Sequence, residues 1–230
     1  HSSSTPLKMS YDATYTFNQP DSDLILRSSD NVDFHVHKLI LSLASPVFEA
    51  MLPFPHPESS AEDNKDGRPV ARMTETARAL DLLLRVCYPT ANPVLDKADD
   101  IGVLMEAARK FDIGVAQTLA MQALTRRELM EEDPLGVYII ACQLQLGDEA
   151  RKAARLTLRY DHPIRGVAPA GLEHVPATIL YELLDYREKC KAAAYSVVSD
   201  NAFWQRHWEE FQYELCFSCN PTFESPESSR

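Results

Sequence analysis

Cysteine and histidine residues near the C-terminal end of the chain have the types and spacing of a zinc site. Cys216 and Cys219 form a C-x-x-C pair, and two such thiolates can chelate one zinc ion from a tight turn. Cys190 and His207 could complete a tetrahedral set of ligands. The pair also borders a tail rich in Pro, Ser and Glu, and Cys190 falls on the apolar face of an expected helix. We therefore expect no zinc, and a small zinc-binding structural or redox protein remains the alternative function.

The sequence contains few other residue patterns that could support metal binding or catalysis. His35 and His37 lie two residues apart and could share a metal from one strand, but no cysteine or acid cluster lies nearby at ligand spacing, so we expect His35 to face solvent. The chain lacks G-x-S-x-G, H-E-x-x-H, Walker A and G-x-G-x-x-G signatures, and its seven glycines make a phosphate-binding loop improbable. These observations predict a protein that is not an enzyme and has no cofactor.

The hydrophobic pattern changes from a strand period to a helix period within one short span. Residues 32–36 alternate apolar and polar side chains, which predicts a half-buried strand, and Leu24 and Leu26 share a face in a preceding strand. Asp30 and Asn31 form a turn pair between them. Together they predict an antiparallel hairpin.

A helix is expected to follow at Lys38, with Leu39, Ile40 and Leu43 as its apolar residues. Ser45 and Pro46 then have the order of an N-cap and a first-turn proline, so a second helix should begin there. This second helix is expected to bury Val47, Phe48 and Met51.

Downstream, four prolines between residues 53 and 69 predict a loop, and Val70 to Met73 is a short strand candidate. The rest has helical spacing. The expected helices run from Leu80 to before Pro89, from a cap at Asp99-Asp100 past Ala108, from Gly114 past Leu124, over 134–146 with Gly147 as its end, over 148–160, and from Pro176 to Val197.

The span from Asp23 to Met51 resembles the BTB (POZ) domain, a protein-interaction fold. The matching pattern is a strand with Phe-x-x-His-basic, a Leu-rich helix and Ser-x-x-Phe, here Phe34, His37, Lys38, Leu41, Ser45 and Phe48. The resemblance continues through residues 80–89 and 104–111 and covers about residues 20 to 130. The amino-acid sequence of residues 25–52 is also similar to that of the single-BTB proteins of basidiomycete fungi.

The resemblance implies an α+β fold: a BTB/POZ core, with a small sheet and a helical cluster, followed by an all-helical C-terminal extension. The expected segments are a flexible N-terminal segment at 1–20, the BTB/POZ domain at 21–130, a helical BACK-like extension at 131–212 and a flexible tail at 213–230. In that extension, we favour a core role for the aromatic residues Trp204, Trp208 and Phe211 over an interface role.

The resemblance also implies self-association and docking onto a cullin scaffold as a ubiquitin-ligase substrate adaptor. In the family, an acid and a base at the positions of Asp23 and Lys38 line a charged pocket near the dimer surface. Residues 11–21 lack the helical stripe of the helix that tightly dimerising members exchange, so we expect a weak homodimer. Glu58 is the nearest match to the cullin-docking glutamate. The expected protein-interaction residues are Asp23, Leu24, Ile25, Lys38, Leu39, Ile40 and Glu58.

Composition, charge and cysteine content narrow the classes of partner and the cellular compartment that we expect for this protein. The chain has 230 residues, a formal charge of −11 and no basic stripe, which argues against nucleic acid. No apolar run reaches the about 18 residues that span a membrane. Five cysteines without a disulfide-like spacing are typical of a reducing compartment. We expect an intracellular protein, cytoplasmic or nuclear, that binds other proteins.

Overall fold

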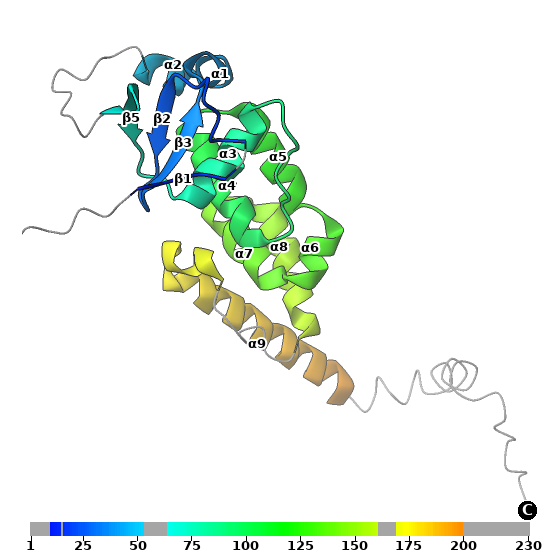
Figure 1. Ribbon diagram of the computed structural model, residues 1–230. Coiled ribbons are helices and arrows are strands. Elements are labelled where there is room, and N and C mark those ends of the chain that lie inside the picture. The colour runs from blue at the N-terminus through cyan, green and yellow to red at the C-terminus, as the bar shows by residue number, and fades with distance from the viewer. Residues whose placement is uncertain (1–9, 15, 53–63, 161–168, 200–230) are drawn as a thin grey trace, which may run out of the picture. The chain divides into compact units, whose positions relative to one another are not determined.

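The computed structural model describes residues 10–14, 16–52, 64–160 and 169–199. The chain divides into two compact units, residues 1–175 and 176–230. The first unit contains a small sheet and a cluster of helices (Figure 1). Within the described part, the second unit contributes one long helix, α9 (Ala177–Ser199), which begins just after Pro176 as the sequence predicted.

The sheet has five strands in the order β1-β3-β2-β5-β4. Two strands form its centre, β2 (Leu24–Arg27) and β3 (Val32–Val36), which pair in antiparallel fashion and confirm the predicted hairpin. Asn31 takes a positive φ of 63° in the turn between them, a conformation that asparagine tolerates well. At the two edges lie β1 (Tyr11–Asp12), parallel to β3, and β4 (Asn64–Lys65), paired with β5 (Arg68–Arg72).

Strand β3 is buried on both faces, so the expectation of a half-buried strand with a solvent-facing His35 was wrong. Val32, Phe34 and Val36 share the apolar face, where the Phe34 ring lies 5.9 Å from that of Phe17. On the opposite face His35 is only 7% exposed. The reason is that charged side chains from other strands cover this face and supply hydrogen-bond partners to its polar groups.

Two short helices follow the hairpin, α1 (Lys38–Ala44) and α2 (Pro46–Met51). Ser45 caps α2 as predicted, because its side chain accepts a hydrogen bond from the Phe48 amide at 3.0 Å. The fully buried Phe48 ring stacks on Phe111 with centroids 4.5 Å apart. This stacking fixes α2 to the helical cluster.

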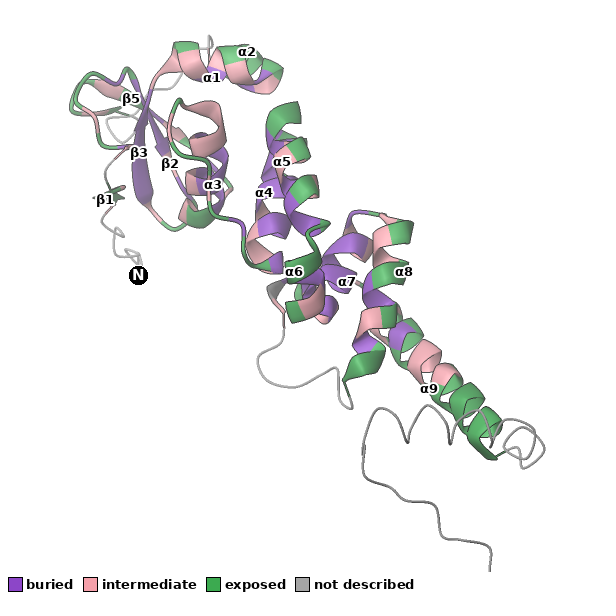
Figure 2. Ribbon diagram, turned by 90° about the vertical axis from the view of Figure 1, so that its right-hand side faces the viewer, coloured by how far each residue is buried: buried purple, intermediate pink, exposed green. Residues whose placement is uncertain are grey.

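The helical cluster beside the sheet consists of α3 (Ala77–Cys87), α4 (Ala98–Lys110) and α5 (Gly114–Leu124) (Figures 1 and 2). Thr76 caps α3 by accepting a hydrogen bond from the Ala79 amide. The N-cap of α4 is Lys97, so Asp99 and Asp100 lie in its first turn rather than at the cap. Carboxylates in a first turn still interact favourably with the helix dipole.

Three further helices extend the first unit, α6 (Arg127–Glu132), α7 (Pro134–Gln143) and α8 (Gly147–Leu156), followed by the 3-10 turns η2 (Thr157–Arg159) and η3 (Ala170–His174). Asp133 and Pro134 begin α7 as predicted. The expected helix end at Gly147 was wrong, because Gln145 takes a positive φ of 61° and the chain turns there, leaving Gly147 as the first residue of α8.

Candidate protein-interaction surface

Helix α1 is anchored at its N-terminal end by two side chains from distant parts of the chain. The Asp23 carboxylate accepts a hydrogen bond from the Lys38 amide at 2.8 Å. The Tyr88 hydroxyl accepts one from the His37 amide at 2.7 Å, and burial raises the pKa of Tyr88 to about 12. Leu41, which is fully buried, fixes the inner side of the helix. The outer side of α1 is therefore presented on a firmly held element.

The outer side of α1 is apolar. Leu39 and Leu43, four residues apart and thus on one helix face, are 69% and 81% exposed, and Ile40 between them is half-buried. On α2, Met51 is 39% exposed, so the expectation that it is buried was wrong. Figure 2 shows exposed residues along both helices. Single exposed leucines are common, but two on one face of a seven-residue helix form a surface that water solvates poorly.

The residues expected at the interaction surface lie in two different environments, some on or beside α1 and others buried in the sheet. Leu39, Ile40 and Lys38 lie on α1, and Asp23 lies beside its first turn. Leu24 and Ile25 instead lie in the central strand β2 with 3% and 0% exposure. Side chains this deeply buried offer no surface to a partner, so the expected contact is revised to α1. Glu58 lies outside the described residues.

Asp23 and Lys38, the two residues expected to line a charged pocket near the dimer surface, meet at the start of α1. The hydrogen bond that joins the two residues runs from the Lys38 backbone amide to the Asp23 carboxylate. Such a bond satisfies one of the amides that every helix leaves unpaired at its start. The geometry assigns Asp23 a capping role at α1.

A network of charges that the sequence did not reveal covers the second face of the sheet. Asp33, with a fully buried side chain, accepts hydrogen bonds from Arg27 at 2.6 and 2.9 Å and from Lys65 at 2.7 Å. Lys65 also donates to Asp12 at 2.7 Å, and His35 Nε2 lies 3.1 Å from the same Asp12 carboxylate. Burial alone would raise the pKa of Asp33, but the hydrogen bonds from Arg27 and Lys65 hold it at about 2.

The geometry of this charge network indicates a structural role. Two cations and two carboxylates balance one another, and together they connect β1, β2, β3 and β4. Among the described residues, no group of three or more histidine, cysteine, aspartate or glutamate side chains has an arrangement that could hold a metal ion. Cys190 is half-buried on α9, and the other candidate zinc ligands, His207, Cys216 and Cys219, lie outside the described residues. The aromatic residues at 204, 208 and 211 lie outside them as well.

Comparison with protein families identifies the first part of the chain. Residues 15–128 match the family model of the BTB/POZ domain. They form a BTB domain with a small curled sheet and a helical cluster, and BTB domains are protein-interaction modules. No curated protein matches the chain. In the part of the chain that the structure describes, no helix is both long enough and apolar enough to cross a membrane.

Proposed function

We propose that this BTB/POZ domain pairs with a second copy of itself through the outer side of α1, and that the pair displays the chain to further protein partners. The observation that supports the proposal is the exposure of Leu39 and Leu43 on one face of an anchored helix. In a two-fold dimer the same patch meets its own copy, so these two residues would supply four leucine side chains to the contact.

The proposed contact is a weak one. Burial of an exposed leucine contributes roughly 1.5–3 kcal/mol, and association costs roughly 4–15 kcal/mol in lost freedom and ordering. The contact proposed here uses the outer side of α1 alone, a helix of seven residues. We therefore expect less buried area than the roughly 2,000 Å² or more of obligate dimers, and a dimer that dissociates on dilution.

The test is the molar mass of the full chain, measured by light scattering across a hundredfold dilution. The wild type should change from dimer to monomer, and Leu43→Asp should be monomeric throughout because its carboxylate would be buried without a partner. Val115→Asp is the matched control, since Val115 is 71% exposed on a different helix, α5. Circular dichroism should show all three proteins folded.

Two results would contradict self-association through α1. One is a wild-type monomer at the highest concentration. The other is a Leu43→Asp variant that dimerises as strongly as the wild type.

A finer role rests on the BTB resemblance alone: docking onto a cullin as the substrate adaptor of a ubiquitin ligase. Co-purification of the chain with the N-terminal domain of a cullin tests it, with Glu58→Ala as the variant that should lose binding. Retention of the cullin by Glu58→Ala would remove that residue from the proposal. The similarity to basidiomycete single-BTB proteins likewise stays a prediction.

A further inference from the structure

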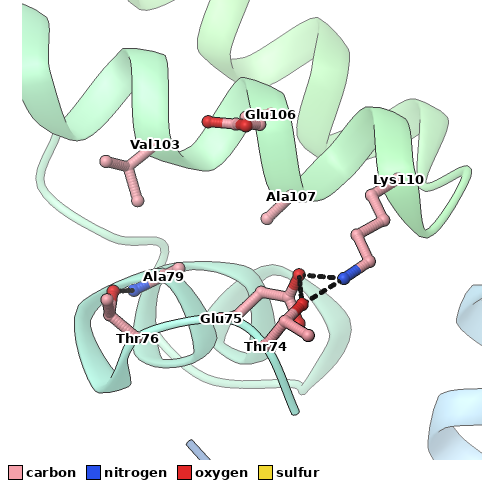
Figure 3. A pocket seen from close by; sticks show the side chains of 8 residues that line it. All are labelled: Thr74, Glu75, Thr76, Ala79, Val103, Glu106, Ala107 and Lys110. Atoms are coloured by element: carbon pink, nitrogen blue, oxygen red, sulfur yellow. Dashed lines mark hydrogen bonds and ion pairs between the residues drawn. The ribbon is translucent and has the colours of Figure 1, made fainter. Parts of the chain in front are cut away.

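Outside the α1 surface, the described residues present two features that could receive another group. The first is a cavity of about 420 Å³ between the segment that leads into α3 and the side of α4 (Figure 3). Beside it, Lys110 donates hydrogen bonds to Glu75 and to the Thr74 hydroxyl, so its basic side chain already has partners within the chain. The second is the C-terminal part of α9, where apolar side chains face solvent.

The last residues of α9, 191–199, are all exposed and carry little charge. Lys191 is the one charged residue among them, and alanines occupy positions 192–194. Tyr195 is 74% exposed and Val198 is 59% exposed. The green end of α9 in Figure 2 is this part of the helix, called here the exposed end of α9. A helix that is apolar on several sides is normally buried against another element.

The chain carries a segment suited to cover this surface immediately after α9. Residues 203–215, the aromatic segment, include four large apolar residues at intervals of four, three and four, which is the spacing of one helix face: Trp204, Trp208, Phe211 and Leu215. Asp200 and Asn201 precede the segment, and both residue types favour turns and helix N-caps. The sequence after α9 therefore predicts a turn followed by a second amphipathic helix.

Length and register match an antiparallel hairpin that turns at Asn201. The positions three residues from the turn are Val198 and Trp204, and the positions seven residues from it are Ala194 and Trp208. At about 1.5 Å per residue, the aromatic segment forms a helix of roughly 20 Å, against roughly 13 Å for the exposed end of α9. The segment is therefore long enough to cover the whole exposed end.

The charges of the two surfaces are complementary as well. Lys191 has a 78% exposed side chain and lies 4.0 Å from Glu188, a contact that contributes little at so exposed a site. Glu210 lies nine residues after the turn and Lys191 lies ten residues before it, so the hairpin brings their side chains to the same level. An ion pair between them favours the antiparallel arrangement.

The aromatic segment reaches this surface more readily than a separate molecule does. It is joined to α9 by residues 200–202 alone, so closing the contact costs little loop entropy. The effective concentration of a segment on so short a connection is on the order of millimolar. A second copy of the chain would first have to lose its own translational and rotational freedom.

We propose that the aromatic segment folds back as a helix onto the exposed end of α9, with Trp204 against Val198 and Trp208 against the alanines at 192–194. The inference goes beyond the function proposed above and does not rest on it, since α1 and α9 belong to different units of the chain. The contact closes an apolar surface that would otherwise offer a second site of self-association. A chain with two such sites can form open-ended assemblies.

Tryptophan fluorescence of the full chain tests the contact, because Trp204 and Trp208 are the two tryptophans of the sequence. Acrylamide should quench them at least about threefold less efficiently in the native chain than in the urea-unfolded chain. Val198→Asp should raise quenching toward the unfolded value, since it places a carboxylate under the Trp204 ring. Val115→Asp on α5 is the matched control, because it makes the same substitution at a valine that is 71% exposed and should leave quenching unchanged.

Nuclear Overhauser contacts in the wild-type chain test the register without any substitution. The indole protons of Trp204 should show contacts to the methyl groups of Val198, and those of Trp208 to the methyl group of Ala194. Absence of both contacts, once the signals of α9 are assigned, would overturn the proposal.

Dilution separates this contact from self-association. Quenching that stays constant across a hundredfold dilution, in the wild type and in Leu43→Asp, supports a contact within one chain whether or not the α1 dimer exists. Quenching that rises on dilution would assign the cover to a second copy and overturn the inference. Tryptophans quenched as readily in the native chain as in the unfolded chain, or equal quenching in the wild type and Val198→Asp, would overturn it as well.

Discussion

Replacement of Asp33 by asparagine tests the charge network that covers one face of the sheet. Asparagine keeps the shape of the side chain and removes its charge, which leaves Arg27 without its carboxylate while Lys65 retains Asp12. Loss of one member of a buried pair typically costs about 3–5 kcal/mol. Because Arg27 and Lys65 are 14% and 27% exposed and regain some hydration, we expect a loss of about 2–4 kcal/mol in the free energy of unfolding at neutral pH.

The pH dependence separates the charge of Asp33 from its packing. Its pKa is about 2 in the folded protein against an ordinary value of 3.8, a depression worth roughly 2 kcal/mol. A group with a depressed folded pKa stabilises the fold above its unfolded pKa and loses that contribution as the pH falls. Between about pH 5 and pH 2, the wild type should therefore lose roughly 2 kcal/mol more than Asp33→Asn.

The assay is urea denaturation followed by circular dichroism at a series of pH values. Asp66→Asn is the matched control: Asp66 is exposed in the β4–β5 turn with a φ of 52°, which asparagine also adopts, so its stability should change by less than about 0.5 kcal/mol. Parallel pH profiles for the wild type and Asp33→Asn, or a loss below about 1 kcal/mol at neutral pH, would refute the electrostatic account.

Three further substitutions test the core. Phe48→Ala should cost about 3–5 kcal/mol in urea denaturation because it removes the ring stacked on Phe111, and a loss below about 1 kcal/mol would contradict that burial. Ile25→Asp should abolish the folded circular dichroism spectrum, since the residue is 0% exposed; a folded monomer would show that Ile25 belongs to a surface. Gly136→Ala would place Cβ 2.1 Å from Asp133 Oδ2, so it should cost about 1–2 kcal/mol through the lost cap of α7, and the loss should be much smaller in an Asp133→Ala background.

Local signals in the sequence were sufficient for much of this fold. The hairpin, the cap at Ser45 and the start of α7 at Asp133 each depend on residues within a few positions of one another, so their spacing specifies them. Helix ends were less accurate. Gln145, for example, reverses the chain through a left-handed conformation that its residue type does not favour.

The polar face of the sheet could not be predicted because its partners are distant in sequence. The alternation in β3 correctly places Asp33 on the opposite face of the sheet from Phe34. It does not indicate whether water or protein covers the polar face. Lys65 and Asp12 come from strands of two residues each, too short to show any period.

Helix α1 shows what an apolar pattern on a short helix can mean. The sequence assigns Leu39 and Leu43 to one apolar face, yet in a single copy of the chain the core side of the helix is occupied by Leu41. A helical stripe specifies side chains that avoid water, and either the core or a partner can provide the cover. Because Lys38 is held by Asp23 at the start of the helix, α1 has little freedom to rotate its leucines inward. An apolar face fixed outward in this way favours coverage by a second molecule, which is why the dilution behaviour of Leu43→Asp tests the function and not only the stability of the domain.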